Sequence, residues 1–399
     1  MFKKTAAVLL AALTVIGVGA CGTGNSDNGE SSENTQSQSQ EGEKDMKRVM
    51  NEENVKLVGR TYLAENGTLW CGLSGSGVEF EFTGKKLDIM IEGDNVSTSG
   101  NRNNYCRLAI YVNGERAVDD MLNDAVKLYT PIDGADTVTA QVKIVKLSET
   151  AMSTMGIMPI NLEEGADIKP AAVKAHRLEF IGDSITCGYG VDDEDPTHNF
   201  MTSTEDVTKA YAYKTAELLD ADYSMFSISG WGIISGYSGD GQKHEDQQVP
   251  LYYEKTGFSY GAFDKTKPES IDWDFGRYQP EAVVINLGTN DDSYTGGNAD
   301  RERDYIDSYK EFLKTVRKDS PDAHIFLALG IMGDRLYPAV ETVCSEYKAE
   351  TGDENISTFH FTPQDANADG LAADYHPTEK THEKAAAALS EEIKTVMGW

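Results

Sequence analysis

The stretch LEFIGDSITCGYG, residues 178–190, decides the fold of the second half of this chain. It begins with a mostly apolar run typical of a strand and turns at Gly182-Asp183-Ser184. Further strand-like runs are found at residues 223–228, 282–287 and 324–329. Between and after them lie stretches with the apolar spacing of helices, at residues 206–220, 301–318, 336–349 and 379–396. This alternation predicts a parallel sheet with helices on both faces, a three-layer α/β/α fold.

Polar motifs stand at the predicted ends of these strands. Ser184 follows the first strand, and Gly230 follows the second. Asn290, in the motif Gly288-Thr289-Asn290-Asp291, follows the third, and His376 precedes the last helix. In open parallel sheets, sites form beyond the carboxyl ends of the strands. We therefore expect these residues to meet at one edge of the sheet.

Together these residue types are what a serine nucleophile requires. A serine attacks a carbonyl only where a base takes its proton and donors hold the developing oxyanion. We assign Ser184 as the nucleophile and His376 as the base. The Ser184 N–H, the Gly230 N–H and the Asn290 amide form the predicted oxyanion hole. The structural alternatives are a turn serine, a histidine at a helix start, a capping amide and a turn glycine, with Gly232 as a rival to Gly230.

With these motifs in this order, residues 176–399 resemble the SGNH (GDSL) hydrolase superfamily. The form GDSITCGYG and the β-rich block before it resemble one branch, carbohydrate esterase family 2, over about residues 50–399. The resemblance implies a jelly-roll domain followed by an SGNH domain. It also implies removal of O-acetyl groups from plant polysaccharides such as xylan and mannan.

The chain departs from the superfamily pattern at the third member of the triad. Members usually carry an Asp three residues before the His, whereas here that position is Ala373 and Asp374 lies two residues before His376. Two interpretations stay open. Either the Asp374 side chain orients His376, or its backbone carbonyl does so and leaves a Ser-His dyad. A carbonyl fixes the tautomer but brings no charge to stabilise the imidazolium.

A period-two rhythm in residues 50–165 predicts a second, all-β domain. Apolar and acidic residues alternate in Val78-Glu79-Phe80-Glu81-Phe82, and Asn113-Gly114 is a strong hairpin signal. Short strands separated by turns predict a sandwich of jelly-roll type. We place this sandwich at residues 48–168 and the hydrolase domain at residues 169–399.

Residues 1–21 are typical of a bacterial lipoprotein signal. Lys3 and Lys4 precede an apolar run over residues 5–18, and small residues precede Cys21. We expect lipid on Cys21 as the only membrane anchor, because no other segment has the roughly 20 apolar residues of a membrane span; a plain secretory signal is the alternative. Residues 22–47 are poor in apolar side chains and predict a disordered linker. The protein is therefore expected to be exported and membrane-anchored on the extracytoplasmic face.

Composition and spacing argue against several other classes. The formal net charge of −30 repels phosphate backbones, so no nucleic-acid partner is expected. The seven histidines form no HxH or HExxH motif, so no metal site is predicted. Residues 365–370 open like a calcium loop, but His376 occupies the position of its bidentate Glu. Three full disulfide pairings or free buried thiols are open to Cys71, Cys106, Cys187 and Cys344.

Three aromatic residues are candidates for stacking on a sugar ring: Trp231, Tyr189 and Trp273, each of which also suits packing. We predict a monomeric serine esterase that releases acetate from an acetylated polysaccharide or oligosaccharide through an acetyl-enzyme, with no cofactor or metal. One alternative is another acyl hydrolase of the same fold, acting on lipids or on acetylated cell-wall glycans. The other is a non-catalytic, glycan-binding surface lipoprotein.

Overall fold

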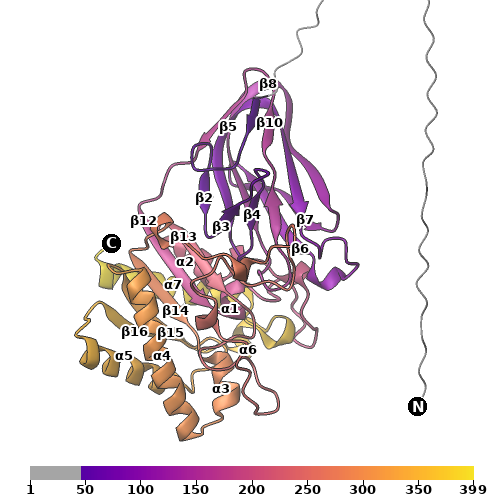
Figure 1. The fold of residues 1–399 in the computed structure, drawn as a ribbon. Coiled ribbons are helices and arrows are strands. Elements are labelled where there is room, and N and C mark those ends of the chain that lie inside the picture. Colours follow the sequence, from indigo (N-terminus) through magenta and orange to yellow (C-terminus); the bar gives the residue numbers. More distant parts are fainter. Residues whose placement is uncertain (1–45) are drawn as a thin grey trace, which may run out of the picture. The chain divides into compact units, whose positions relative to one another are not determined.

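Antiparallel strands build the first part of the chain (Figure 1). The computed structural model describes residues 46–399. The strands of this part are β1 (Met46–Arg48), β2 (Lys56–Val58), β3 (Thr61–Leu63), β4 (Leu69–Cys71), β5 (Gly77–Gly93), β6 (Cys106–Val112), β7 (Glu115–Leu122), β8 (Val126–Lys146), β9 (Met155–Ile157), β10 (Ile160–Leu162) and β11 (Asp167–Pro170). Apart from the β1–β10 pair they form a nine-stranded sheet, of order β3-β4-β9-β5-β8-β6-β7, with β2 and β11 paired to β5. The predicted β-rich domain is confirmed.

The alternation of apolar and acidic residues at positions 78–82 is explained by strand β5, whose successive side chains point to opposite faces of the sheet. Phe80 and Phe82 are fully buried in the core, whereas Glu79 and Glu81 point to the opposite face and pair with lysines. At the Asn113-Gly114 turn between β6 and β7, both residues have positive φ, 51° and 83°. Positive φ at both positions is the requirement of a type I′ hairpin, so the sequence signal located this turn correctly.

The predicted linker ends earlier than expected. Met46 and Lys47 belong to β1 and pair with Leu162 and Asn161 of β10. Backbone pairing can recruit residues whose side chains stay exposed, which is why composition gave no sign of it. The predicted signal and lipid site, with Cys21, and most of the linker lie outside the described residues. Over residues 46–399, no helix combines the length and apolar character that a membrane crossing needs.

The second part of the chain is a parallel sheet between two layers of helices. Its strands are β12 (His176–Gly182), β13 (Ala221–Ser227), β14 (Ala282–Asn286), β15 (His324–Leu329) and β16 (Ile356–His360). Its α-helices are α1 (Ser184–Cys187), α2 (Tyr211–Leu218), α3 (Thr289–Thr295), α4 (Ala299–Asp319), α5 (Tyr337–Thr351), α6 (Ala366–Asp369) and α7 (Glu379–Met397). Short 3₁₀ turns occur at η1 (Arg102–Asn104), η2 (Thr202–Thr204), η3 (Val207–Lys209), η4 (Val249–Leu251), η5 (Pro268–Ser270), η6 (Phe275–Arg277) and η7 (Ala373–Tyr375). The predicted α/β fold is confirmed.

Strand order decides where a site can form in this sheet. The order is β13-β12-β14-β15-β16, so the chain adds one strand on one side of β12 and then reverses to the other side. Such a reversal opens a crevice at the carboxyl ends of the two strands that flank it, here β12 and β14. Ser184 follows β12 and Asn290 follows β14, so both lie at this crevice.

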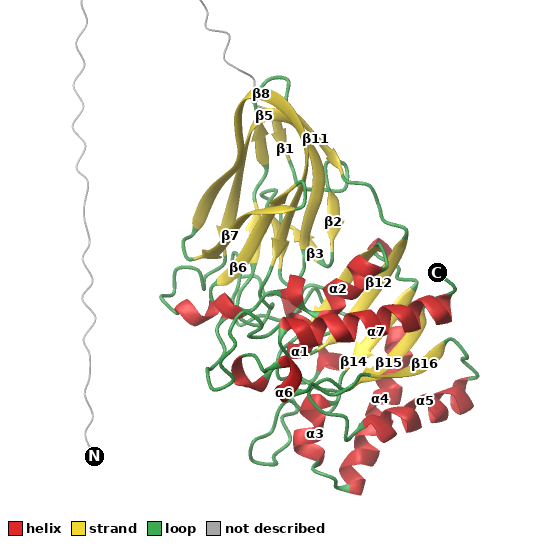
Figure 2. Ribbon diagram, turned by 180° about the vertical axis from the view of Figure 1, so that it is seen from behind, coloured by secondary structure: helices red, strands yellow, loops and turns green. Residues whose placement is uncertain are grey.

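Both faces of the parallel sheet are buried, because successive side chains of a strand point to opposite faces. On β14, Val283 and Ile285 join the core cluster that contains α4 and α5 residues. Val284 instead joins the cluster that contains α2 and α7 residues. Figure 1 shows α4 and α5 on the near face, and Figure 2 shows α2 and α7 on the opposite one.

The predicted helix over residues 206–220 is wrong at both ends. The structure has the 3₁₀ turn η3, then extended backbone at Ala210, then α2. Asp206 accepts hydrogen bonds from the backbone N–H and hydroxyl of Thr208, so it closes a separate turn. It also pairs with Arg116 of the β-rich part at 2.8 Å. The turn that replaces the start of the predicted helix is thus held both by its own capping bonds and by a contact with the β-rich part.

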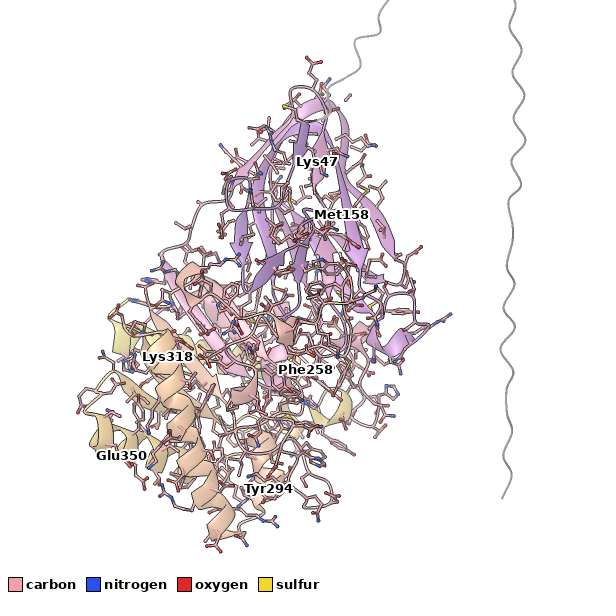
Figure 3. The ribbon with its side chains drawn as sticks, viewed as in Figure 1. Lys47, Met158, Phe258, Tyr294, Lys318 and Glu350 are labelled. Carbon is pink, nitrogen blue, oxygen red and sulfur yellow. The ribbon has the colours of Figure 1, made fainter. Side chains whose placement is uncertain are left out.

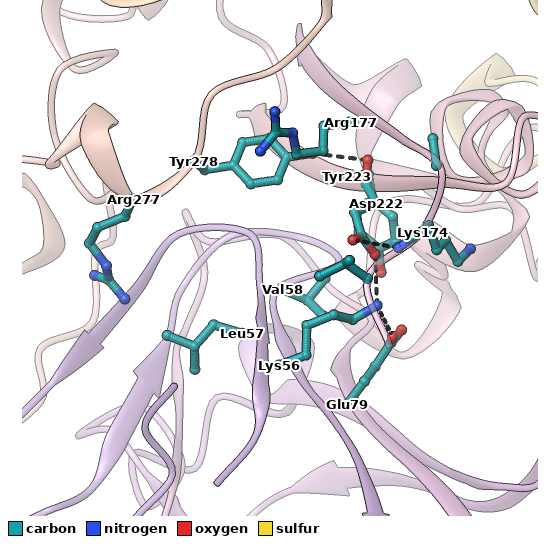
Figure 4. Close-up of a pocket in the computed structure, with 12 residues that line it drawn as sticks. Lys56, Leu57, Val58, Glu79, Lys174, Arg177, Asp222, Tyr223, Arg277 and Tyr278 are labelled. Carbon is teal, nitrogen blue, oxygen red and sulfur yellow. Dashed lines mark hydrogen bonds and ion pairs between the residues drawn. The ribbon is translucent and has the colours of Figure 1, made fainter. Parts of the chain in front are cut away.

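Buried and partly buried ion pairs join the two parts of the chain. Arg60 of the β-rich part pairs with Glu179 of β12 at 3.0 Å, and both side chains are buried. Lys56 of β2 binds Glu79 of β5 at 2.6 Å and Asp222 of β13 at 2.7 Å, as Figure 4 shows. These pairs lie along β12 and β13, on strands whose other ends carry the candidate site.

Candidate active site

Ser184 and His376 form a hydrogen-bonded pair at the carboxyl end of the sheet. The Ser184 hydroxyl donates to Nε2 of His376 at 2.9 Å, although 192 residues separate them in sequence. Their exposed fractions are only 7% and 8%. Ser184 is the first residue of α1, whose N-cap is Asp183. The residue before that cap must be glycine, because a Cβ on Gly182 would lie 2.1 Å from Oγ1 of Thr186.

A backbone carbonyl holds the ring of His376. Nδ1 of His376 donates to the carbonyl of Asp374 at 3.0 Å. Asp374 and Tyr375 both have left-handed backbone, with φ of 52° and 61°, and this tight turn aims the carbonyl back at the ring. A proton on Nδ1 leaves the Nε2 lone pair free to accept the serine proton. The geometry therefore gives a Ser-His pair oriented by a carbonyl, one of the two interpretations left open by the sequence.

The Asp374 side chain acts elsewhere. One of its carboxylate oxygens, Oδ2, accepts a hydrogen bond from the Tyr189 hydroxyl at 3.1 Å. The Tyr189 ring stacks on His376 at 3.9 Å between ring centroids and on Phe200 at 4.4 Å. Asp374 thus reaches the histidine through its carbonyl and, indirectly, through a tyrosine ring.

Burial keeps His376 neutral. It lowers the pKa of the imidazole from 6.5 to about 4, because a buried ring is poorly solvated when charged. The Asp374 carbonyl and the Asp374 carboxylate oppose this effect only in part. A neutral imidazole is the form that can take a proton from Ser184.

Two backbone N–H groups, those of Ser184 and Gly230, are candidates for the oxyanion hole. The first residues of a helix have N–H groups without helical partners, and Asp183 caps that of Ile185, not that of Ser184. Gly230 has φ of 79° and open space where a Cβ would be. Within residues 46–399 its N–H has no protein acceptor. The rival Gly232 donates its N–H to the Gln247 carbonyl at 3.3 Å, so only Gly230 of the two is free.

The Asn290 side chain lies between these elements. Its Nδ2 donates to the Trp231 carbonyl at 2.8 Å and to Oδ2 of Asp183 at 3.2 Å. These two acceptors fix which end of the amide is the N–H₂ group. Asn290 therefore links the loop after β14 to the serine turn and to the Gly230 loop.

Buried carboxylates organise the loops of the site. Asp291 accepts N–H bonds from Ile233 at 2.9 Å, from Ile234 at 2.7 Å and from Ser235 at 3.2 Å. Burial raises its pKa to about 6, against the effect of these bonds. Burial, with the nearby Asp291 charge, raises the pKa of Asp183 to about 7. These acids serve as hydrogen-bond acceptors for backbone and amide groups.

Two of the three aromatic residues predicted to stack on a sugar are buried and are not free to do so. Trp231 is 3% exposed and packs against Tyr252 and Phe258, the latter labelled in Figure 3. Trp273 is 9% exposed, with the guanidinium groups of Arg60 and Arg277 over its ring. Stacking on His376 and Phe200 occupies Tyr189. For Trp231 and Trp273 the prediction is wrong, because both rings are buried in the core. For Tyr189, whose side chain is partly exposed beside His376, it stays a prediction.

Exposed tyrosines that sequence reasoning missed flank the site instead. Tyr375, next to His376, is 56% exposed, and Tyr237 is 63% exposed. The Tyr237 N–H donates to the Gly230 carbonyl at 2.7 Å, which places this residue beside the loop that follows β13 and carries Gly230 (the oxyanion loop). For Tyr375 the adjacent histidine was a usable signal. For Tyr237 the sequence contained no such signal, because only the folding of residues 230–237 brings this residue close to Gly230.

One group of metal-ligand residue types occurs in the described part of the chain: Glu149, Cys187 and Glu205, all buried. The calcium-like loop is an ordinary turn, in which Asp365 caps α6 and Asp369 pairs with Lys380 and Lys384. No disulfide is present among the four cysteines of residues 46–399, Cys71, Cys106, Cys187 and Cys344, which are buried thiols.

Comparison with known proteins agrees with this geometry. The model of the GDSL-like lipase/acylhydrolase family matches residues 180–384, just over half of the chain, and the model of the carbohydrate esterase 2 N-terminal domain matches residues 57–171. The chain belongs to the GDSL-like lipase/acylhydrolase family. Its β-rich part is similar to the N-terminal domain of carbohydrate esterase family 2.

Several members of the family are similar over most of the chain. An acetylxylan esterase/glucomannan deacetylase of Cellvibrio japonicus is 27% identical, over 86% of this chain and 89% of its own. A cellulase/esterase of Acetivibrio thermocellus is 29% identical over 82% of this chain, which spans only 38% of that longer protein. The structure of an acetyl xylan esterase from the rumen bacterium Butyrivibrio proteoclasticus has a TM-score of 0.78 and 25% identity, covering 88% of this chain and 97% of that one. The structure of a family two carbohydrate esterase from Clostridium thermocellum, in complex with cellohexaose, has a TM-score of 0.73 and 27% identity, covering 86% of this chain and 99% of that one.

Proposed function

We propose that this protein is a serine esterase that removes O-acetyl groups from a polysaccharide such as xylan or mannan. The observation that carries the proposal is the 2.9 Å hydrogen bond from the Ser184 hydroxyl to a neutral His376, together with a Gly230 N–H that has no protein acceptor within residues 46–399. A nucleophile, a base and oxyanion donors are the complete set that acyl transfer requires.

The reaction proceeds in two halves. Ser184 Oγ attacks the acetyl carbonyl carbon while its proton passes to Nε2 of His376. The carbonyl electron pair moves onto oxygen, where the N–H groups of Ser184 and Gly230 and the Asn290 amide hold the negative charge. The C–O bond to the sugar then breaks, and the sugar oxygen takes the proton from His376. Water, deprotonated by His376, attacks the acetyl-serine and releases acetate and free Ser184.

Asn290 contributes to the oxyanion hole through its weaker bond. Its bond to Asp183 is 3.2 Å long, against 2.8 Å to the Trp231 carbonyl. The N–H directed at Asp183 is therefore the one that turns toward a developing oxyanion, while the Trp231 carbonyl keeps the amide in place.

A polysaccharide substrate is supported by the surroundings of the pair. Tyr237 and Tyr375 expose their rings beside it and offer amphipathic faces suited to sugar rings. The acetylxylan esterases among the relatives and the cellohexaose complex point to the same class of ligand. An exported lipoprotein anchored through Cys21 and acting as a monomer fits a polymer that cannot cross a membrane.

Acetate release tests the proposal. The purified chain and its Ser184→Ala variant are incubated with 4-nitrophenyl acetate, acetylated xylan and acetylated mannan. We expect release by the parent and a loss of about 10³-fold or more in the variant. Equal release by both proteins would contradict the serine mechanism. Retained glycan binding without any turnover would favour a binding protein, and faster turnover of long acyl chains would favour a lipase.

A further inference from the structure

A loop of the β-rich part reaches into the hydrolase part directly under the oxyanion loop. Residues 147–154 connect β8 to β9, and all but one of them are buried. Ala151 joins the core cluster of the hydrolase sheet. The backbone of this segment also bonds to the hydrolase part, with the Val207 N–H donating to the Leu147 carbonyl and the Tyr260 N–H to the Ala151 carbonyl.

Glu149 in this segment binds the residue next to the oxyanion glycine. Its Oε2 accepts the N–H of Ser229 at 2.8 Å. On the other side of Gly230, the Gly230 carbonyl accepts the Tyr237 N–H at 2.7 Å. The peptide that carries the Gly230 N–H is thus held from both flanks. With φ of 79° and open space around its Cα, Gly230 would otherwise be free to rotate this N–H away.

Glu149 is itself held by a second buried acid. Its backbone N–H donates to Oε2 of Glu205 at 2.8 Å, and the two side chains lie within 4.8 Å of each other and of Cys187 Sγ. The remaining oxygen of each carboxyl group, Oε1, is buried and has no partner within residues 46–399.

The local charge indicates that these two acids share one proton. The buried ammonium of Lys146 donates to the carbonyls of Ser148 at 2.5 Å and Glu149 at 2.7 Å, so it supplies one positive charge. Arg107, a second cation near Glu205, is already paired with Asp119 and Asp192. Two carboxylates would therefore leave one buried negative charge uncompensated, which is costly. Burial raises the pKa of both glutamates, and the charge of Glu149 raises that of Glu205 further.

We propose that Glu149 is a positioning residue supplied by the β-rich domain, which fixes the Gly230 N–H toward the oxyanion, with Glu205 as its proton-sharing partner. The proposal rests on the esterase function above and extends it. Glu149 touches neither the substrate nor the reacting atoms, so it affects kcat only by orienting the Gly230 N–H.

Substitutions that differ only in hydrogen bonding test this role in the full chain. Glu149→Met keeps the volume but removes the acceptor, and Glu149→Gln keeps an acceptor for the Ser229 N–H. Loss of an oxyanion donor costs about 10²- to 10³-fold in kcat, so a donor that is only misdirected should cost about 10- to 100-fold in Glu149→Met. KM should change less than about twofold, and Glu149→Gln should recover most of the loss.

Inhibition by methylboronic acid, which forms a tetrahedral anion on a serine, should weaken in Glu149→Met by the same factor as kcat. Lys56→Met, which removes an ion pair between the domains at the other end of β13, is the matched control (Figure 4). It should lower the thermal midpoint without changing kcat or boronate affinity. Circular dichroism checks that each variant is folded.

Several results would overturn the proposal. One is a folded Glu149→Met variant with parental kcat, and another is an equal loss in the Met and Gln variants. Loss of activity on chelation that zinc restores would mean that a cation, not a proton, joins the two acids. An inactive parent would instead contradict the esterase function, so the two failures are distinguishable.

Discussion

The two sides of Ser184 are stabilised in different ways. On the base side, no carboxylate of residues 46–399 is hydrogen-bonded to His376, whose ring is held by the Asp374 carbonyl and the Tyr189 ring. On the oxyanion side the buried acids Asp183, Asp291 and Glu149 accept N–H bonds from the loops that carry the donors. The difference teaches that acidic residues in this site bind the donor loops directly, whereas the one acid beside the base, Asp374, acts on the imidazole only from a distance.

The largest effect that would sharpen this comparison is expected for Asn290→Ala. The substitution removes an oxyanion donor and the link between the β14 loop and the Gly230 loop. We expect kcat for 4-nitrophenyl acetate to fall about 10²- to 10³-fold, as for other single donors. Steady-state kinetics of the folded variant measure it, and a loss below threefold would remove Asn290 from the oxyanion side.

Asp291→Asn tests whether the acids act as acceptors. An amide has only one oxygen, so at least one of the three N–H groups that Asp291 binds loses its partner. An unpartnered buried donor costs about 1–3 kcal/mol. We expect a lower thermal midpoint and a kcat about 10-fold lower, since the loop that follows Gly230 loosens. Unchanged stability and activity would show that the loop after Gly230 keeps its conformation without the Asp291 carboxylate.

Tyr189→Ala probes the base side through pH. The buried, neutral His376 is the active base, so activity should rise as pH increases through about 4 and stay level above it. Removing the stacked ring admits water and stabilises the charged form of His376. The pH at which activity rises should therefore move from about 4 toward 6.5. Aromatic pairs contribute about 0.5–1.5 kcal/mol, so kcat at neutral pH should fall about 2- to 12-fold. Tyr189→Phe keeps the ring and should keep the parental pH profile. A parental pH profile in the Ala variant would refute the role of stacking.

The smallest effect is expected for Asp374→Asn. The backbone carbonyl that orients His376 is retained, and the new amide can still accept from Tyr189. We expect kcat to fall threefold or less, whereas loss of a true triad carboxylate costs about 10⁴-fold. A loss above 10²-fold in kcat/KM would make Asp374 a triad member and erase the contrast between the two sides.

Much of the fold and the site could be read from local sequence. The alternation of Phe80 and Phe82 with acids predicted a strand, and Asn113-Gly114 predicted the hairpin. Ser184, Gly230, Asn290 and His376 were selected because each follows a strand or precedes a helix at one edge of the sheet, and the structure brings them together. Local patterns succeed here because side-chain period and turn chemistry depend only on neighbouring residues.

Other features depended on contacts that no local pattern encodes. The predicted helix over residues 206–220 is interrupted by extended backbone at Ala210, after a turn whose capping residue, Asp206, pairs with Arg116 of the β-rich part. Trp231 and Trp273 were candidates for stacking on a sugar, but both rings are buried in the core. In each case a tertiary contact outweighed a small local preference.

The sequence by itself indicated the proposed chemistry of this protein, because a serine, a glycine and an amide at strand ends, with a histidine before the last helix, are the residue types that acyl transfer requires. Only the tertiary structure decided how that chemistry is supported. Whether the Asp374 side chain or carbonyl reaches His376 depends on a left-handed turn at two non-glycine residues. That Glu149 lies under Gly230 depends on the packing of one domain on another. Both are matters of orientation over a few ångströms, which residue identity and spacing do not fix.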